Sequence, residues 1–391
     1  MRPAAVALLI LALAAAPAGA HDPSAWGGSF RSRDGGSTWT PIDAGLFIGG
    51  AVMLAIDPND PNHILYATDA RLLRSRNGGR DWVQEPTGAF SAPTLAVAFS
   101  STGESILAAT AAGVFRTDAG GAWQPAHVPA AANPVLAIVA GAASGRFYVL
   151  AARGVYRTED RGETWSRCAE ALQDAPLSGL AVARDAPETV AVIAGGRVYA
   201  STDTCETWPL RGAGLPDGKV EALASDTVPG RLWAAAADRI YRSDTGGRAW
   251  EAQGQPLPEP GISVRGIEVS ADTETMVLST HRGLYRSANA GARWALIEGN
   301  VPVHLEAGPL VRDPKDPATL YAGFSLTPYN EIRRRAQEGS NLLAQVDVVS
   351  LAGGGAFLVL LAVAAAYIVR RLWRVSVAAA AAPTTHTTRT R

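Results

Sequence analysis

The stretch SRDGGSTW, from Ser32 to Trp39, places a carboxylate, two glycines and a tryptophan within eight residues. It returns along the chain as SRNGGRDW (75–82), TDAGGAW (117–123), TEDRGETW (158–165), STDTCETW (201–208), SDTGGRAW (243–250) and SANAGARW (287–294). Self-similarity at a fixed period indicates one structural unit used repeatedly. The period therefore decides the fold before any single copy is interpreted.

The spacing of the tryptophans that end the seven copies gives the length of the repeat. They are Trp39, Trp82, Trp123, Trp165, Trp208, Trp250 and Trp294, with spacings of 43, 41, 42, 43, 42 and 44 residues. Between two tryptophans the chain shows three short β-type runs, such as PVLAIVA, RFYVLAA and GVYRT, and a fourth begins at the tryptophan. Four short antiparallel strands per repeat are typical of a propeller blade, so the sequence predicts an all-β, seven-bladed β-propeller.

The third position of the copies varies in a way that defines its role. The residue is Asp34, Asp160 and Asp203 in three copies, Asn77 and Asn289 in two, and Thr245 in another. The copy at Thr117 is one residue short, so Asp118 stands out of register. Asn and Thr can replace a hydrogen-bond acceptor but not an acid or base, so we predict that this side chain accepts bonds from its own turn.

The pattern Ser/Thr-x-Asp-x-Gly-x-Thr-Trp resembles the Asp box, or BNR repeat, of sialidases, sortilins, xyloglucanases and the photosystem II stability/assembly factor family. The resemblance covers most of residues 26–345. It implies that each box is a hairpin turn between the third and fourth strands, at the outer rim of a blade. The tryptophan is then expected to pack between neighbouring sheets.

Within that superfamily, the photosystem II stability/assembly factor group is the most similar in pattern. Sialidases carry a Phe-Arg-Ile-Pro type motif, whereas this chain has Phe30-Arg31-Ser32-Arg33, and the sialidase propeller has six blades. The resemblance implies a non-catalytic scaffold that assists the assembly or stability of a membrane complex, with no cofactor. The alternative is a membrane-tethered glycoside hydrolase or carbohydrate-binding propeller.

The two ends of the repeat region predict how the ring closes. The run WGGSFRS (26–32) supplies one strand before the first copy, and GPLVRDPKDPATLYAGFS (308–325) supplies two after the last. Joining them gives one composite blade. A competing closure uses RRAQEGSNL (334–342), which aligns with a decayed eighth copy.

The chain ends predict export and a membrane anchor. Residues 1–20 have the pattern of a signal peptide. Residues 348–369 carry no charge and are long enough to cross a bilayer, and arginines follow at once. The expected order is signal peptide 1–20, propeller 21–325, juxtamembrane segment or degenerate hairpin 326–347, transmembrane helix 348–369 and cytoplasmic tail 370–391. We expect a single-pass protein of a bacterial inner membrane, with the propeller on the periplasmic or extracellular side.

The net charge of the chain restricts the classes of partner that it is expected to bind. The net charge is −1, so the chain has no basic footprint for nucleic acid. The expected partners are the membrane and a membrane protein complex or other protein, with a glycan as the alternative. The scattered histidines show no ligand spacing, so no metal site is predicted.

An arginine precedes the copy in six repeats. These residues are Arg31, Arg74, Arg116, Arg157, Arg242 and Arg286. In one interpretation they form a ring that binds an anionic partner. In the other, each guanidinium caps a neighbouring turn while its stem packs between blades.

Cys168 and Cys205 are the only cysteines. Their positions, three residues after Trp165 and three before Trp208, put both on the outer parts of adjacent blades. A disulfide at the rim and two separate small buried side chains are both compatible with the sequence.

Overall fold

The computed structural model describes residues 27–334, with gaps at 44–45, 47, 87–92, 119–120, 153, 169–171, 173, 186, 303, 329 and 332–333. The chain divides into two compact units, and all described residues belong to the unit Asp22–Leu342. The predicted signal peptide, transmembrane helix and tail lie outside the described residues, as does most of segment 326–347. Among the described residues, no helix has the length and apolar character needed to cross a membrane.

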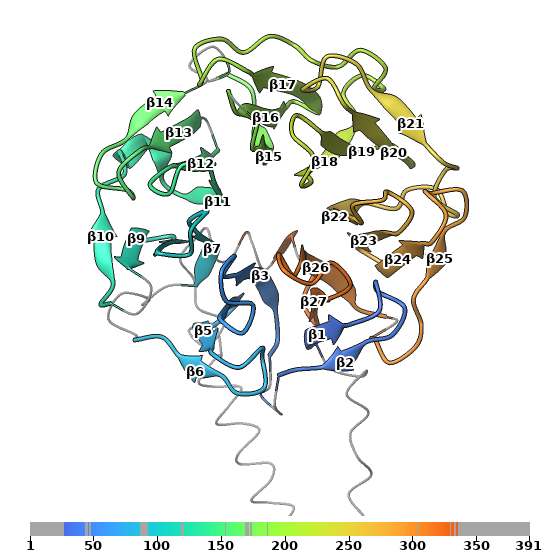
Figure 1. The fold of residues 1–391 in the computed structure, drawn as a ribbon, viewed down its shortest axis with the longest axis horizontal. Helices are drawn as coiled ribbons and strands as arrows, with labels where there is room; N and C mark the ends of the chain where they lie inside the picture. Colours follow the sequence, from blue (N-terminus) through green and yellow to red (C-terminus); the bar gives the residue numbers. More distant parts are fainter. Residues whose placement is uncertain are drawn as a thin grey trace, which may run out of the picture. The chain divides into compact units, whose positions relative to one another are not determined.

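Seven small antiparallel sheets surround a central axis (Figure 1). Blade 1 consists of β3 (Ala51–Ile56), β4 (Ile64–Thr68), β5 (Leu72–Ser75) and β6 (Val83–Gln84). Blade 2 consists of β7 (Thr94–Phe99), β8 (Ser105–Thr110), β9 (Gly113–Asp118) and β10 (Gln124–Ala126). Blade 3 consists of β11 (Val135–Ala140), β12 (Phe147–Ala151), β13 (Gly154–Thr158) and β14 (Ser166–Cys168), preceded by the short 3-10 helix η2 (Ala130–Ala132).

The remaining blades follow the same order from the axis outward. Blade 4 consists of β15 (Leu177–Ala183), β16 (Thr189–Ala194) and β17 (Arg197–Ser201). Blade 5 consists of β18 (Val220–Ser225), β19 (Leu232–Ala236), β20 (Arg239–Ser243) and β21 (Glu251–Gln253). Blade 6 consists of β22 (Val264–Val269), β23 (Met276–Thr280), β24 (Gly283–Ser287) and β25 (Ala295–Leu296). Blade 7 consists of β26 (Glu306–Arg312), β27 (Leu320–Ser325), β1 (Gly28–Ser32) and β2 (Thr40–Pro41), and the predicted seven-bladed propeller is confirmed.

Blade 7 closes the ring with strands from both ends of the propeller. β1 pairs antiparallel with β27, with Phe30 opposite Ala322. The rings of Phe30 and Phe324 meet edge to face at 5.2 Å. The composite blade is therefore confirmed, and strand β1 takes the place that the competing segment 334–342 would have filled.

Blade 4 differs from the expected four strands, because its sheet contains only three. The segment after Trp208 still follows the edge of β17, where Arg211 donates to the carbonyl of Val198 at 2.8 Å. Pro209 interrupts a regular ladder, because proline has no backbone N–H to donate. A single bridge between Tyr199 and Leu210 remains.

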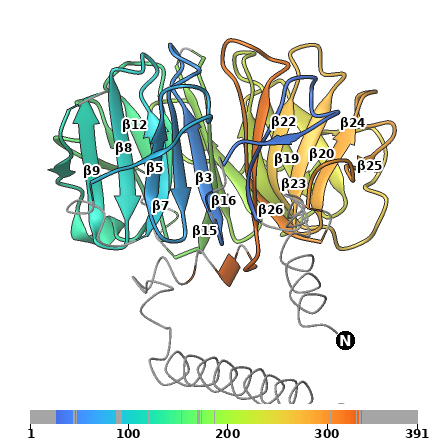
Figure 2. The same ribbon diagram turned by 90° about the horizontal axis from the view of Figure 1, so that it is seen from below.

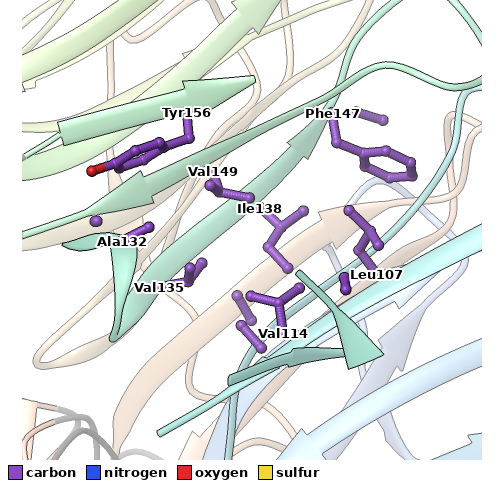
Figure 3. Close-up of a cluster of buried hydrophobic side chains, with 13 residues drawn as sticks. Leu107, Val114, Ala132, Val135, Ile138, Phe147, Val149 and Tyr156 are labelled. Atoms are coloured by element: carbon purple, nitrogen blue, oxygen red, sulfur yellow. The ribbon is translucent and has the colours of Figure 1, made fainter. Parts of the chain in front are cut away.

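The core is divided among the blade junctions. The second strand of every blade is buried along its whole length, because both of its faces pack against neighbouring blades. One hydrophobic cluster lies at each of the seven junctions. Figure 3 shows the cluster between blades 2 and 3, where Leu107 and Val114 meet Ile138 and Phe147.

Two kinds of turn lie on the same face of the ring. In blade 1, the turn between β5 and β6 donates from the Gly78 N–H to the carbonyl of Asn62, in the turn between β3 and β4. Blade 7 repeats this bond from Gly35 to Ala318, and blade 6 from Ala290 to Glu274. We call this surface the turn face. The strands run between it and the opposite face (Figure 2).

Candidate functional site

The repeated stretch forms a tight turn held by its own side chains. In the first copy, Ser32 donates from Oγ to Asp34 at 2.8 Å and accepts from the N–H of Gly36 at 2.8 Å. Asp34 accepts from the Thr38 N–H at 2.8 Å and from the Thr38 hydroxyl at 2.6 Å. Gly36 has a φ of 83°, the left-handed region that favours glycine. The hydrogen bonds that this carboxylate accepts thus come from its own turn.

Asparagine and threonine at the third position accept the same hydrogen bond as the aspartates. The N–H of the seventh residue bonds to Asn77 at 2.9 Å, to Asn289 at 2.9 Å and to Thr245 at 3.0 Å. Hydrogen bonds from the side chain and backbone of Thr207 lower the pKa of Asp203 to about 2. A carboxylate held ionised in this way is an acceptor and a poor proton donor.

The seven tryptophans lie at the outer parts of the junctions. Each packs with the cluster shared by its own blade and the preceding one. Several indoles also bond backward across the junction: Trp82 donates to the Ile42 carbonyl at 2.8 Å and Trp250 to the Arg211 carbonyl at 2.8 Å. The tryptophans therefore join blades to one another.

Four of the arginines that precede the turns reach the next blade. Arg31 donates to the carbonyl of Gly78 at 2.9 Å, and Arg286 donates to that of Gly35 at 2.8 Å. Both carbonyls belong to the fourth residue of the next repeated turn. In blade 3, Arg157 makes the equivalent bond to Thr204. In blade 2, Arg116 pairs with Glu163 at 2.9 Å.

Two arginines of the set have other partners. The turn of blade 2 is one residue short, and Arg74 instead contacts Glu85 and His63 of its own blade. Arg242 pairs with Asp244 at 3.0 Å. All six guanidinium groups thus have protein partners, and we assign no ligand to this outer set.

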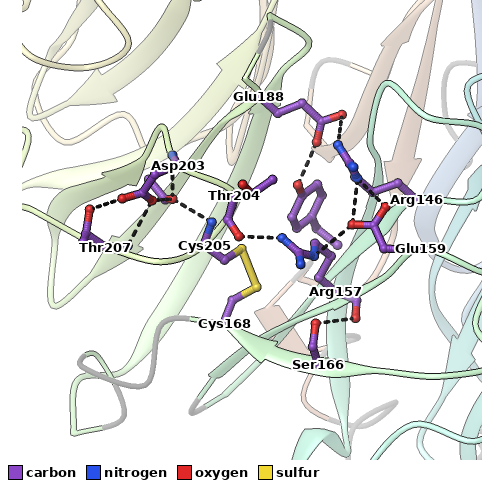
Figure 4. The surroundings of a disulfide bond; sticks show 12 residues. Arg146, Arg157, Glu159, Ser166, Cys168, Glu188, Asp203, Thr204, Cys205 and Thr207 are labelled. Atoms are coloured by element: carbon purple, nitrogen blue, oxygen red, sulfur yellow. Dashed lines mark hydrogen bonds and ion pairs between the residues drawn. A yellow bond between two sulfur atoms is a disulfide. The ribbon is translucent and has the colours of Figure 1, made fainter.

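A disulfide joins blades 3 and 4 (Figure 4). Cys168 ends β14, and Cys205 occupies the fifth position of its turn, where other copies have glycine. Their Cα atoms are 5.2 Å apart. Alongside, Tyr148 donates to Glu188 at 2.7 Å across the same junction. The junction is therefore covalent as well as packed.

A cavity opens at the centre of the turn face, where the inner strands end. It has two adjoining parts with volumes of about 540 and 430 Å³, which share Arg184, Ser225, Glu268 and Arg312 in their lining. Together the two parts touch all seven blades, from Ile56 in blade 1 onward. We call it the mouth cavity.

Two arginines supply the positive charge of the mouth cavity. Arg184 is exposed to it and has no hydrogen bond or ion pair with another described residue. The protein atoms around the guanidinium of Arg184 displace water and lower its pKa, while the charge of Glu188 acts to raise it. Arg312 donates through Nη1 to the Pro317 carbonyl, but among the described residues its buried Nε and Nη2 have no acceptor in hydrogen-bonding geometry.

The carboxylates of the mouth cavity are already engaged. Glu268 lies 3.3 Å from Nε of Arg312. Asp226 accepts from the Trp233 indole at 2.8 Å and from the Val228 N–H at 2.7 Å. Asp313 accepts the N–H groups of its own turn, including that of Lys315 at 2.8 Å. Free hydrogen-bonding capacity therefore lies with the arginines.

Burial gives Glu268 an unusual protonation behaviour. It raises the pKa of this carboxyl to about 7, although Arg312 acts in the opposite direction. The negative charge of Asp226 adds to the rise. Glu268 consequently changes its charge near neutral pH.

The mouth cavity was missed by the sequence interpretation. Arg184 and Arg312 each stand directly before the aspartate of a first turn, in RDAP and RDP, and this shared position was the available signal. The predicted arginines lie in third strands, whereas Arg312 and Glu268 lie in innermost ones. Among the described residues, no group of three or more His, Cys, Asp or Glu side chains is placed to hold a metal ion.

No protein family and no curated protein matches this chain in sequence. In structure it is similar to YCF48 bound to a D1 peptide, with a TM-score of 0.55 and 16% identity over 71% of this chain and 93% of that one. YCF48 from Cyanidioschyzon merolae gives 0.56 and 14%, over 72% and 98%. The GH74 xyloglucanase from Xanthomonas campestris gives 0.54 and 19%, over 71% of this chain and 52% of the enzyme. At these identities the likeness shows the propeller fold alone.

Proposed function

We propose that this protein is a membrane-anchored, extracytoplasmic propeller that acts as a non-catalytic scaffold for protein interaction. Its role is to assist the assembly or stability of a membrane complex. Residues 348–369 are the anchor, and the mouth cavity receives part of the partner.

The observation that carries the proposal is the uneven distribution of free polar groups in the mouth cavity. Among the described residues, Arg184 has no hydrogen bond or ion pair, and Nε and Nη2 of Arg312 have no aligned acceptor, while Asp226 is hydrogen-bonded within the protein and Glu268 is ion-paired. Val182, Ile267 and Pro314 supply apolar lining around them. A surface with apolar walls and free guanidinium groups suits a peptide segment that carries carboxylates.

The fold comparison supports the same class of function. One structure similar to this chain is a YCF48 propeller solved with a D1 peptide, so the architecture can hold a peptide. Loops that end at the mouth of a propeller channel are a natural place for such binding, because all blades contribute to one concave surface.

The test is purification of the tagged full-length protein from its native membrane in mild detergent, followed by mass spectrometry. We expect a particular membrane complex to co-purify in a fixed ratio. The Arg184→Ala/Arg312→Ala double variant should lose it, because the free donors are removed.

Arg248→Ala is the matched control, since Arg248 is an exposed arginine in the repeated turn of blade 5. It should keep the complex. Recovery of the wild-type protein without any partner, or equal loss in the control, would contradict the proposal.

Membrane anchoring has its own test. Alkaline carbonate washing of membranes should leave the full-length protein in the pellet, and deletion of residues 348–369 should release it. Release of the wild-type protein by the wash would refute the anchor.

A second candidate is a glycoside hydrolase or carbohydrate-binding propeller, favoured by Glu268 beside Asp226. Such enzymes use a carboxyl with a raised pKa as the acid, and the pKa of Glu268 is about 7. The bonds from Trp233 to Asp226 and the pairing of Glu268 with Arg312 weigh against it. Hydrolysis of β-glucan oligosaccharides by the wild type, abolished in Glu268→Gln, would replace the scaffold proposal with this one.

A further inference from the structure

Two ion pairs connect the innermost strands of blades 6 and 7, with opposite polarity. Near the turn face, Glu268 of β22 pairs with Arg312 of β26 at 3.3 Å. Toward the other ends of the same strands, Arg265 of β22 pairs with Glu306 of β26 at 2.7 Å. Both glutamates are part-buried, so the two pairs can be compared directly.

The pairs differ in how well the arginine is satisfied. Arg265 donates to the Ala307 carbonyl at 3.2 Å and to Glu306 at 2.7 Å, both in hydrogen-bonding geometry. Arg312 is close to Glu268, yet its Nε and Nη2 lack an aligned acceptor among the described residues. The contact between Glu268 and Arg312 is therefore close but poorly aligned, and it satisfies Arg312 less fully than Glu306 satisfies Arg265.

The position of this pair makes Glu268 a competitor for any bound anion. Glu268, Arg312 and Arg184 all line both parts of the mouth cavity. A carboxylate entering the cavity would find donors on both arginines and would meet the negative charge of Glu268. Arginine binds carboxylates through paired, parallel N–H bonds, which the present contact leaves open.

We propose that Glu268 is a proton-controlled gate of a carboxylate-binding site formed by Arg184 and Arg312. The inference rests on the proposed function, because it concerns the same cavity. With Glu268 ionised, Arg312 is neutralised from within and the anion is repelled. When Glu268 takes up one proton, the repulsion ends and the carboxylate of the partner occupies the donors of Arg312.

The surrounding groups set the direction of the effect. The charged groups that line the cavity with Glu268 are Arg184, Asp226, Arg312 and Asp313. Asp226 opposes ionisation of Glu268, and Arg312 favours it. Because the pKa of Glu268 is about 7, the protonated form dominates below that pH and the ionised form above it. Binding of an anion should therefore become tighter as the pH falls through 7.

The experiment measures binding of rhodamine-labelled peptides to the full-length protein in mild detergent, by fluorescence anisotropy. The probes are a C-terminally amidated hexaglutamate and a hexaglutamine with a free C-terminus, which separate side-chain carboxylates from a chain end. If only the protonated gate admits the anion, the affinity at pH 6 should exceed that at pH 8 about tenfold. The ligand carboxylate stays ionised over this range.

Three variants test the gate. Glu268→Gln should bind at pH 8 about as tightly as the wild type does at pH 6, and its affinity should no longer depend on pH. Glu306→Gln, which removes the carboxylate of the other ion pair, should keep the wild-type pH dependence. Arg184→Ala/Arg312→Ala should bind neither peptide. Circular dichroism confirms that each variant is folded.

Separate results would contradict the gate and the proposed function. A Glu268→Gln variant with the same affinity at pH 8 as the wild type, or with an unchanged pH dependence, overturns the gate. If the gate fails while Arg184→Ala/Arg312→Ala still loses the membrane complex, the scaffold function stands without it. If the peptides bind as expected but no complex co-purifies, the site stands and the proposed function fails.

Discussion

Two sets of arginines on the turn face have opposite surroundings. At the rim, Arg31 and Arg286 end on carbonyls of the next repeated turn. At the mouth cavity, Arg184 has no such partner among the described residues, and Arg312 leaves both Nε and Nη2 without an aligned acceptor, whereas Arg31 leaves only Nε. The difference indicates that rim arginines such as Arg31 and Arg286 join neighbouring blades, whereas Arg184 and Arg312 are available to a ligand.

The largest effect on the rim side should come from its covalent bond. Replacing Cys168 and Cys205 by serine removes a link between residues 37 positions apart. We expect a loss of about 3–4 kcal/mol in the free energy of unfolding, because the unfolded chain gains freedom. Urea denaturation of the full-length protein measures it. Reductant should lower the wild-type midpoint and leave the double variant unchanged; equal midpoints without reductant would show that the bond is not a stabilising part of the rim.

On the mouth side, the largest effect should depend on pH. The pKa of Glu268 is raised to about 7, above its value in the unfolded chain. The folded protein therefore binds the proton of Glu268 more tightly than the unfolded chain does. The resulting stabilisation is complete below the unfolded pKa and is lost as the pH rises through 7. The stability of Glu268→Gln relative to the wild type should increase between pH 5 and pH 8, by about 1–3 kcal/mol. Parallel stability curves for the two proteins would contradict the raised pKa.

The contrast between rim and mouth can be tested with single arginines. Arg31→Ala removes a charged hydrogen bond between blades and should cost about 1–2 kcal/mol of unfolding free energy. Arg184→Ala removes no bond to a described residue and should stay within about 0.5 kcal/mol. Thermal melts of the two variants and the wild type measure these losses of stability. If Arg184→Ala proved the more destabilising, the assignment of the two arginine sets would be reversed.

The smallest effect concerns the acceptor in the repeated turn. Hydrogen bonds from Thr164 outweigh slight burial and lower the pKa of Asp160 to about 2. The contribution of this ionised carboxylate is present above its unfolded pKa and is lost as the pH falls through 2. Asp160→Asn should keep the turn and lose less stability between pH 4 and pH 2 than the wild type. Asp160→Ala is the comparison that removes the acceptor, and equal stability of Asn and Ala variants would refute the acceptor role.

Most of the rim could be predicted from local sequence. Each repeated turn is closed by hydrogen bonds between residues within eight positions of one another, as between Ser32, Asp34 and Thr38. These bonds can therefore be predicted from the order of the residues alone. The exceptions arise from single residues. Pro209 prevents a fourth strand in blade 4, and the short copy at Thr117 sends Arg74 to Glu85.

The number of repeats and the order of strands within a blade follow from periodicity and turn chemistry, whereas the choice between the two closures depended on the pairing of β1 with β27. That Arg184, Glu268 and Arg312 line one cavity is visible only in the folded ring. They come from three blades, and no local pattern relates Glu268 to the two arginines. Ring closure brings the ends of the inner strands together, and burial there changes the charge behaviour of Glu268.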